Sequence, residues 1–105
     1  MKLRDAWARV YKVFLSSASI ESPLLAAERP GYHRALDDAY IETMFYAGVL
    51  VRKYADSVYS AAGEAIDSSV ETEPVWRRLR DERRGFIQAI QGELREEEAE
   101  SSSLL

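Results

Sequence analysis

Apolar residues recur every three or four positions through most of this chain, and the spacing is most regular between Gly31 and Ser69. The apolar positions of that stretch are Leu36, Tyr40, Met44, Ala47, Val51, Tyr54, Val58, Ala61 and Ala65. One face of an α-helix repeats in this way, whereas a half-buried strand alternates apolar and polar residues. No proline interrupts the stretch, so the pattern predicts a helical segment that would be roughly 55 Å long as a single rod.

Gly48 is the weak point of this predicted long helix. A glycine inside a helix costs about 1 kcal/mol relative to alanine. Three alternatives therefore stay open: a continuous long central helix, a kink near Gly48, or a break there that gives two helices of similar length.

Two further amphipathic segments flank the long one. The first runs from about Leu3 to Ile20, and its apolar positions are Leu3, Trp7, Val10, Phe14 and Ala18. The last opens at Thr72 and runs to about Glu97, with apolar positions at Val75, Leu79, Phe86, Ile90 and Leu94. Between the first two helices, Ser22-Pro23 starts a short extra turn over residues 24–28, and Arg29-Pro30-Gly31 is the clearest turn signal.

Short connections between helices favour antiparallel neighbours. The sequence therefore predicts an all-α fold, a three- or four-helix antiparallel bundle built on one long central helix that is continuous, kinked or broken near Gly48. The 105 residues make one domain. We expect the bundle to occupy residues 1–97 and a disordered acidic, serine-rich tail to occupy residues 98–105.

The composition excludes several classes of function. Cysteine is absent, which excludes disulfides, thiol catalysis and thiolate metal sites. No apolar run approaches the length of a membrane span, and the first residues do not resemble a secretory signal, so we expect a cytoplasmic protein with no membrane span. The net charge of −4 arises from residues 93–100, where five glutamates stand against one arginine.

Candidate catalytic or metal-binding groups are sparse. His33 is the only histidine, and Asp37 follows it at i+4. Two such ligands cannot hold zinc, so we interpret the pair as a solvated helix start and expect no metal or cofactor. Asp37, Asp38 and Glu42 cluster near a predicted helix N-terminus, which favours acidic residues for structural reasons. No nucleophile with its base and no phosphate-binding loop is present, so we predict no catalytic activity.

The last predicted helix carries five arginines between residues 77 and 84. Arg77, Arg80 and Arg84 share a face away from its apolar stripe. Such a ridge is suited to phosphates or to a carboxylate-rich partner surface. Nucleic-acid contact is therefore one alternative, and pairing with acidic residues of the same chain is the other. The candidate intramolecular acids are Glu64, Asp67, Glu71 and Glu73.

Gly85, Ala89 and Gly92 share another face of the same helix. Small residues on one face permit close approach of a second backbone. We expect the apolar stripe to pack inside the bundle and this small-residue face to meet a second copy. A homodimer that contacts through Gly85, Ala89 and Gly92 is the resulting prediction.

The chain resembles the small helical domains of uncharacterised actinobacterial proteins, some of which also carry a membrane anchor. Three segments support the resemblance: Leu-Arg-Asp-Ala-Trp-Ala-Arg-Val-Tyr-Lys-Val-Phe-Leu at the start, Ala-Leu-Asp-Asp-Ala-Tyr-Ile-Glu in the middle, and Arg-Arg-Gly-Phe-Ile-Gln-Ala-Ile-Gln-Gly-Glu-Leu-Arg near the end. The likeness covers residues 3–95. It implies two helices in the middle segment, separated near Gly48, although the proline usual at that break is missing here. It implies no activity and no catalytic residues.

Together these features predict a small helical protein–protein interaction or regulatory module that self-associates and has no catalytic activity. Its protein partner is not identified by the sequence. The alternative is a nucleic-acid-binding regulator that uses the arginine ridge.

Overall fold

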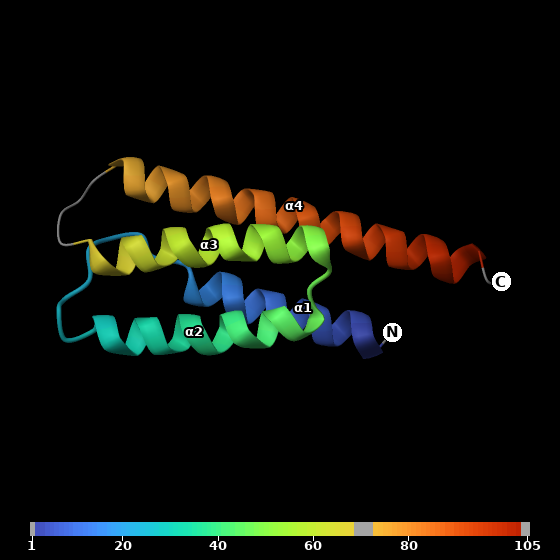
Figure 1. The fold of residues 1–105 in the computed structure, drawn as a ribbon, viewed down its shortest axis with the longest axis horizontal. Coiled ribbons are helices and arrows are strands. Elements are labelled where there is room, and N and C mark those ends of the chain that lie inside the picture. Colours follow the sequence, from blue (N-terminus) through green and yellow to red (C-terminus); the bar gives the residue numbers. More distant parts are fainter. Residues whose placement is uncertain (1, 69–72, 104–105) are drawn as a thin grey trace.

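The described part of the chain folds into four α-helices that run side by side, each antiparallel to the next (Figure 1). The computed structural model describes the backbone of residues 2–68 and 73–103, and the side chains of residues 8–68 and 74–96. The helices are α1 (Lys2–Ser17), α2 (Arg29–Tyr46), α3 (Val49–Asp67) and α4 (Glu73–Ser103), and the described backbone contains no strand. The predicted all-α antiparallel bundle is confirmed, and it has four helices.

The predicted long central segment is divided into α2 and α3, which fold back on each other at Ala47 and Gly48. Both residues are extended, with ψ angles of 132° and 176°. The Arg52 guanidinium donates to the carbonyls of Met44 and Ala47, at 3.2 and 3.4 Å. These bonds satisfy carbonyl groups that have no partner at the end of a helix. The reversal lets both halves of the apolar stripe pack into one core.

The prediction of a turn at Arg29-Pro30-Gly31 is wrong. These residues form the first turn of α2. The chain turns just before them, where the Glu28 N–H donates to the Leu25 carbonyl at 2.9 Å. Proline is compatible with this position because the first N–H groups of a helix have no partner within it. The helix predicted to end near Ile20 stops earlier, at Ser17.

The last helix continues to Ser103, beyond its predicted end near Glu97. Its sequence after Gly92 is rich in glutamate with arginine and alanine, which favour helix, and contains no further glycine or proline. Disorder of residues 98–105 in solution stays a prediction. The predicted start at Thr72 lies outside the described residues.

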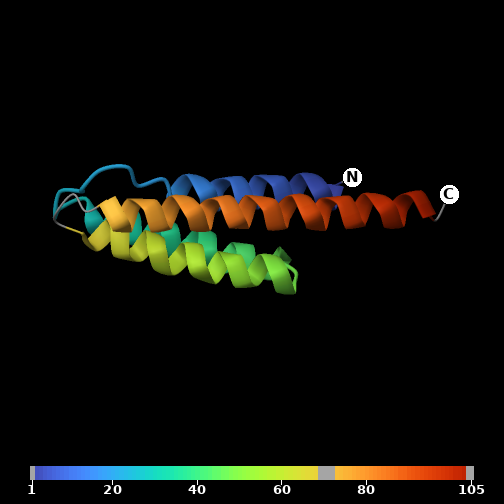
Figure 2. The same ribbon diagram turned by 90° about the horizontal axis from the view of Figure 1, so that it is seen from above.

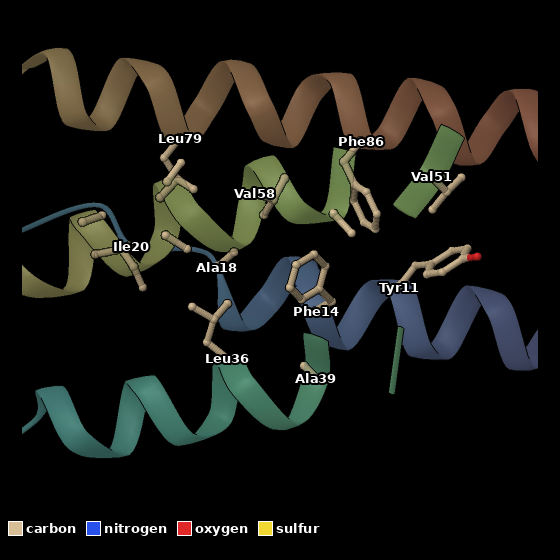
Figure 3. Close-up of a cluster of buried hydrophobic side chains, with 14 of the residues drawn as sticks. Tyr11, Phe14, Ala18, Ile20, Leu36, Ala39, Val51, Val58, Leu79 and Phe86 are labelled. Carbon is tan, nitrogen blue, oxygen red and sulfur yellow. The ribbon is translucent and has the colours of Figure 1, made fainter. Parts of the chain in front are cut away.

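One apolar core fills the inside of the bundle (Figure 3). Phe14 of α1 and Phe86 of α4 are fully buried, and their rings meet edge to face with centroids 5.3 Å apart. Tyr11 of α1 contacts Phe86 in the same manner at 5.7 Å. α3 contributes mainly small buried residues, which let its neighbours approach closely: Ala55, Ala61, Ala62 and Ala65. Leu3 and Trp7 were also predicted to belong to the core, but their side chains lie outside the described residues.

Each helix packs against the next one along the chain. α3 packs against α2 and α4, and α2 also packs against α1. The rings of Tyr11, Phe14 and Phe86 connect α1 to α4 across the core. Figure 2 shows α4 extending well past the α2–α3 turn. The α2–α3 turn lies at the end of the bundle where α1 begins, while the α1–α2 connection and the start of α4 lie at the opposite end (Figure 1). No helix in the described part of the chain is long and apolar enough to cross a membrane.

Candidate functional site

The arginine ridge, Arg77, Arg80 and Arg84, lies on the solvent-facing side of α4. All three residues are exposed. Two of the acids proposed to pair with them have other partners. Glu64 binds the guanidinium of Arg78, with an N–O distance of 2.5 Å, and Asp67 binds His33 at 2.7 Å. The other two candidates, Glu71 and Glu73, lie outside the described side chains.

The His33 pair connects two helices and is not a local contact. His33 is in the second turn of α2, and Asp67 is the last residue of α3. The interpretation of His33 and Asp37 as an i, i+4 pair is therefore wrong, because the end of α3 lies beside the start of α2. No group of three or more potential metal ligands occurs among the described residues.

Asp37 belongs to a cluster of two tyrosines and two aspartates between α2 and α3. The rings of Tyr40 and Tyr59 stack with centroids 4.3 Å apart. The Tyr59 hydroxyl donates to Asp37 at 2.5 Å, and the Tyr40 hydroxyl donates to Asp56. The bond to Asp56, with partial burial, raises the pKa of Tyr40 to about 12, and the bond to Asp37 likewise raises the pKa of Tyr59. Each helix supplies one tyrosine and one aspartate, so the cluster fixes α2 to α3.

The small-residue face of α4 is used largely inside the chain. A Cβ atom added to Gly85 would lie 2.7 Å from Cε1 of Tyr54, and Ala89 is buried. By contrast, a Cβ atom on Gly92 would lie within 4 Å of no neighbouring atom in the part of the chain that the structure describes. The premise that this whole face is free for a second copy is therefore wrong, because Gly85 admits the Tyr54 ring of α3. Open space remains at Gly92.

Large apolar side chains are exposed at the end of the bundle where α2 turns into α3. Phe45 is 82% exposed and Val49 is 89% exposed, while Ile41 and Leu50 are each 56% exposed. We call these four residues the apolar end. Ile41 and Phe45 are one helical turn apart near the end of α2, and Val49 and Leu50 are the first residues of α3, so all four lie close to the α2–α3 turn.

A hollow of about 320 Å³ adjoins the apolar end and lies between the start of α3 and α4. Val49 and Leu50 belong both to the apolar end and to its wall. The other lining residues are Gly48, Val51, Ala89, Gly92, Glu93 and Glu96. We call it the Gly92 hollow. The surface thus combines projecting apolar side chains with a recess that has apolar residues and a glycine in its wall.

A second hollow, of about 310 Å³, lies at the opposite end of the bundle. It is bounded by the α1–α2 connection and the first turns of α4, and it is lined by Ile20, Glu21, Trp76, Arg77, Leu79, Arg80 and Arg83. We call it the arginine hollow. It brings together Arg77 and Arg80 of the ridge but excludes Arg84, and it adds Arg83 and Trp76, which the sequence analysis did not single out.

Comparison of the chain with protein-family models, with curated proteins and with solved structures finds no match. Any proposal about function therefore rests on the geometry of the surfaces. The apolar end was also not predicted from the sequence, although its signal is visible there. Ile41, Phe45 and Leu50 are apolar but lie off the predicted core stripe.

Proposed function

We propose that this chain is a small helical protein–protein interaction module that acts without catalysis and self-associates through the apolar end. The exposure of Phe45 and Val49 carries the proposal. Burying one large apolar side chain contributes about 1.5–3 kcal/mol, so exposing several in one place to water is unfavourable. A contiguous apolar surface on a folded domain is characteristic of a binding surface.

A second copy of the chain is the partner that the shape of this surface favours. In a two-fold symmetric pair each copy presents the same residues, so the surface must complement itself. Here apolar side chains project beside the Gly92 hollow, and Val49 and Leu50 are shared by both. A side chain that projects from one copy therefore has a recess to enter on the other. Ala89 and Gly92, two of the predicted contact residues, lie in that recess.

The charges around the apolar end fit the same arrangement. Lys53 is exposed one turn after Val49, and the exposed Glu96 lies at the Gly92 hollow. We expect Lys53 of one copy to pair with Glu96 of the other across the two-fold axis. Such rim pairs set orientation and association rate more than affinity.

Sedimentation velocity tests the proposal on the full chain. We expect the sedimentation coefficient to rise with protein concentration between the micromolar and millimolar ranges. We also expect the increase to persist at high salt, because apolar burial is not screened while rim charges are. A single monomeric species over the whole range would contradict the proposal.

The exposed ridge Arg77, Arg80 and Arg84 favours nucleic-acid binding as a second candidate function. A ridge that grips phosphates releases counterions, so affinity should fall steeply as salt increases. Reversing the charge at all three positions should abolish binding of a labelled duplex, while the control Lys12→Glu on α1 should change it little. Absence of binding at low salt, or binding with no salt dependence, would reject this candidate.

A further inference from the structure

The arginine hollow has an excess of positive charge around an apolar floor. Among the described residues, three arginines, Arg77, Arg80 and Arg83, line it together with one acid, Glu21. Ile20 and Leu79 form part of its wall and are almost completely buried, at 5% and 2% exposure. Small-molecule sites typically combine such apolar walls with a few polar groups that fix orientation. The charge of these groups selects an anion.

Two hydrogen-bond donors at this hollow have no acceptor in the described part of the chain. They are Nε1 of Trp76 and Nε of Arg83, and both atoms are withdrawn from solvent. Buried donors are nearly always paired in folded proteins, so an unpaired one calls for an explanation. Both belong to residues that line the same hollow. An acceptor bound there, with a small adjustment of the two side chains, would satisfy them.

The position of Arg83 is fixed by a contact to the α1–α2 connection. A terminal nitrogen of its guanidinium donates to the Ser19 hydroxyl at 3.0 Å. This bond orients the planar group and leaves its other N–H groups for a ligand. A guanidinium held in this way is suited to two oxygens of one carboxylate or phosphate.

We propose that the arginine hollow binds a small organic oxyanion, a carboxylate or phosphate monoester that carries an apolar or aromatic group. Arg83 and Arg80 hold the oxyanion, and the apolar group lies against Leu79 and the Trp76 ring. The site is at the end of the bundle opposite to the apolar end (Figure 1), so it is independent of the proposed self-association.

Titration of the full chain, followed by the indole N–H signals in ¹H–¹⁵N spectra at constant ionic strength, tests the site. The probes are benzoate, phenyl phosphate and inorganic phosphate, with benzylamine as a cationic control. The chain has two tryptophans, and a Trp7→Phe variant identifies the Trp76 signal. We expect a saturable shift of that signal with benzoate or phenyl phosphate and none with benzylamine. A response to benzoate alone identifies a carboxylate ligand, and a response to phenyl phosphate alone identifies a phosphate monoester.

Arginine variants distinguish binding in the arginine hollow from attraction to the general positive charge of α4. Arg83→Gln and Arg80→Gln should each weaken binding about tenfold, because each removes a charge-assisted hydrogen bond. Arg84→Gln, outside the hollow, should leave the affinity unchanged, and the Arg80 variant keeps the test valid if loss of the Ser19 contact unfolds the chain. The proposal is overturned by the absence of a saturable shift, by inorganic phosphate binding as tightly as both organic probes, or by equal losses in the Arg84 and Arg80 variants.

Discussion

Gly85 of α4 lies directly against the ring of Tyr54 of α3, so closely that a Cβ atom at position 85 would be 2.7 Å from Cε1 and 2.9 Å from Cδ1 of that ring. These distances are shorter than a van der Waals contact. Glycine at position 85 therefore weakens α4 locally but allows α3 and α4 to pack closely.

Gly85→Ala should consequently destabilise the fold by about 1–3 kcal/mol, because the Tyr54 ring must move. Gly92→Ala is the matched control on the same helix, since its Cβ atom would meet no neighbouring atom of the described residues within 4 Å. That change should stabilise the chain by roughly 0.5–1 kcal/mol through helix propensity and reduced freedom of the unfolded chain. Urea unfolding of the two variants measures the difference, and equal stabilities would show that the contact with Tyr54 is unimportant.

Phe86 is the second position where packing decides stability. Its ring is fully buried and meets the rings of Tyr11 and Phe14. Phe86→Ala should cost about 3–5 kcal/mol through lost burial and the resulting cavity. Its partly exposed neighbour provides the control, because Ile87→Ala should change the melting temperature much less. An unchanged melting temperature for Phe86→Ala would contradict the described core.

The tyrosine–aspartate cluster predicts a loss of stability at alkaline pH. The pKa of Tyr40 is raised from about 10 to about 12, and that of Tyr59 is raised as well. The unfolded chain therefore releases these protons first, so the free energy of unfolding falls as pH increases from about 10 to about 12. In the double variant Tyr40→Phe/Tyr59→Phe this part of the decrease should disappear. Tyr32→Phe at an exposed position of α2 is the control, and an unaltered pH dependence in the double variant would contradict the cluster.

Much of the fold could be predicted from the sequence because burial follows helical periodicity. The three predicted stripes place Phe14, Tyr54 and Phe86 in the core, one from each segment. Phe14 and Phe86 are fully buried, whereas Tyr54 is only partly buried. The division at Gly48 could only be left open, because the apolar stripe continues across it. The reversal is stabilised by the Arg52 guanidinium, which reaches back across the turn to the carbonyls of Met44 and Ala47.

The two hollows and the packing of Gly85 were less predictable, because each depends on residues far apart in the sequence. Periodicity identified Arg77 and Arg80 as a ridge but not the hollow that they share with Ile20 and Arg83. Likewise, the two glycines Gly85 and Gly92 look equivalent in the sequence. The structure distinguishes them because only Gly85 lies against an aromatic ring of α3.

A larger side chain at position 92 would block the Gly92 hollow directly. Gly92→Leu should fill the recess from within and weaken self-association, while the monomer tolerates it because the space beside Gly92 is open. Gln91→Leu adds the same side chain at a neighbouring exposed position and should leave the association constant nearly unchanged. Circular dichroism checks that both variants are folded. Equal association of the two variants would exclude the Gly92 hollow from the contact.

Sedimentation equilibrium of Phe45→Ser beside Leu25→Ser tests the central claim most directly. Both substitutions remove a highly exposed apolar side chain, 82% and 72% exposed, but Leu25 lies in the α1–α2 connection at the opposite end of the bundle. Neither should change the melting temperature of the monomer, because neither side chain belongs to the core. We predict that Phe45→Ser is monomeric at concentrations where the wild type and Leu25→Ser are dimeric. Dimers of equal stability in all three proteins would contradict self-association through the apolar end.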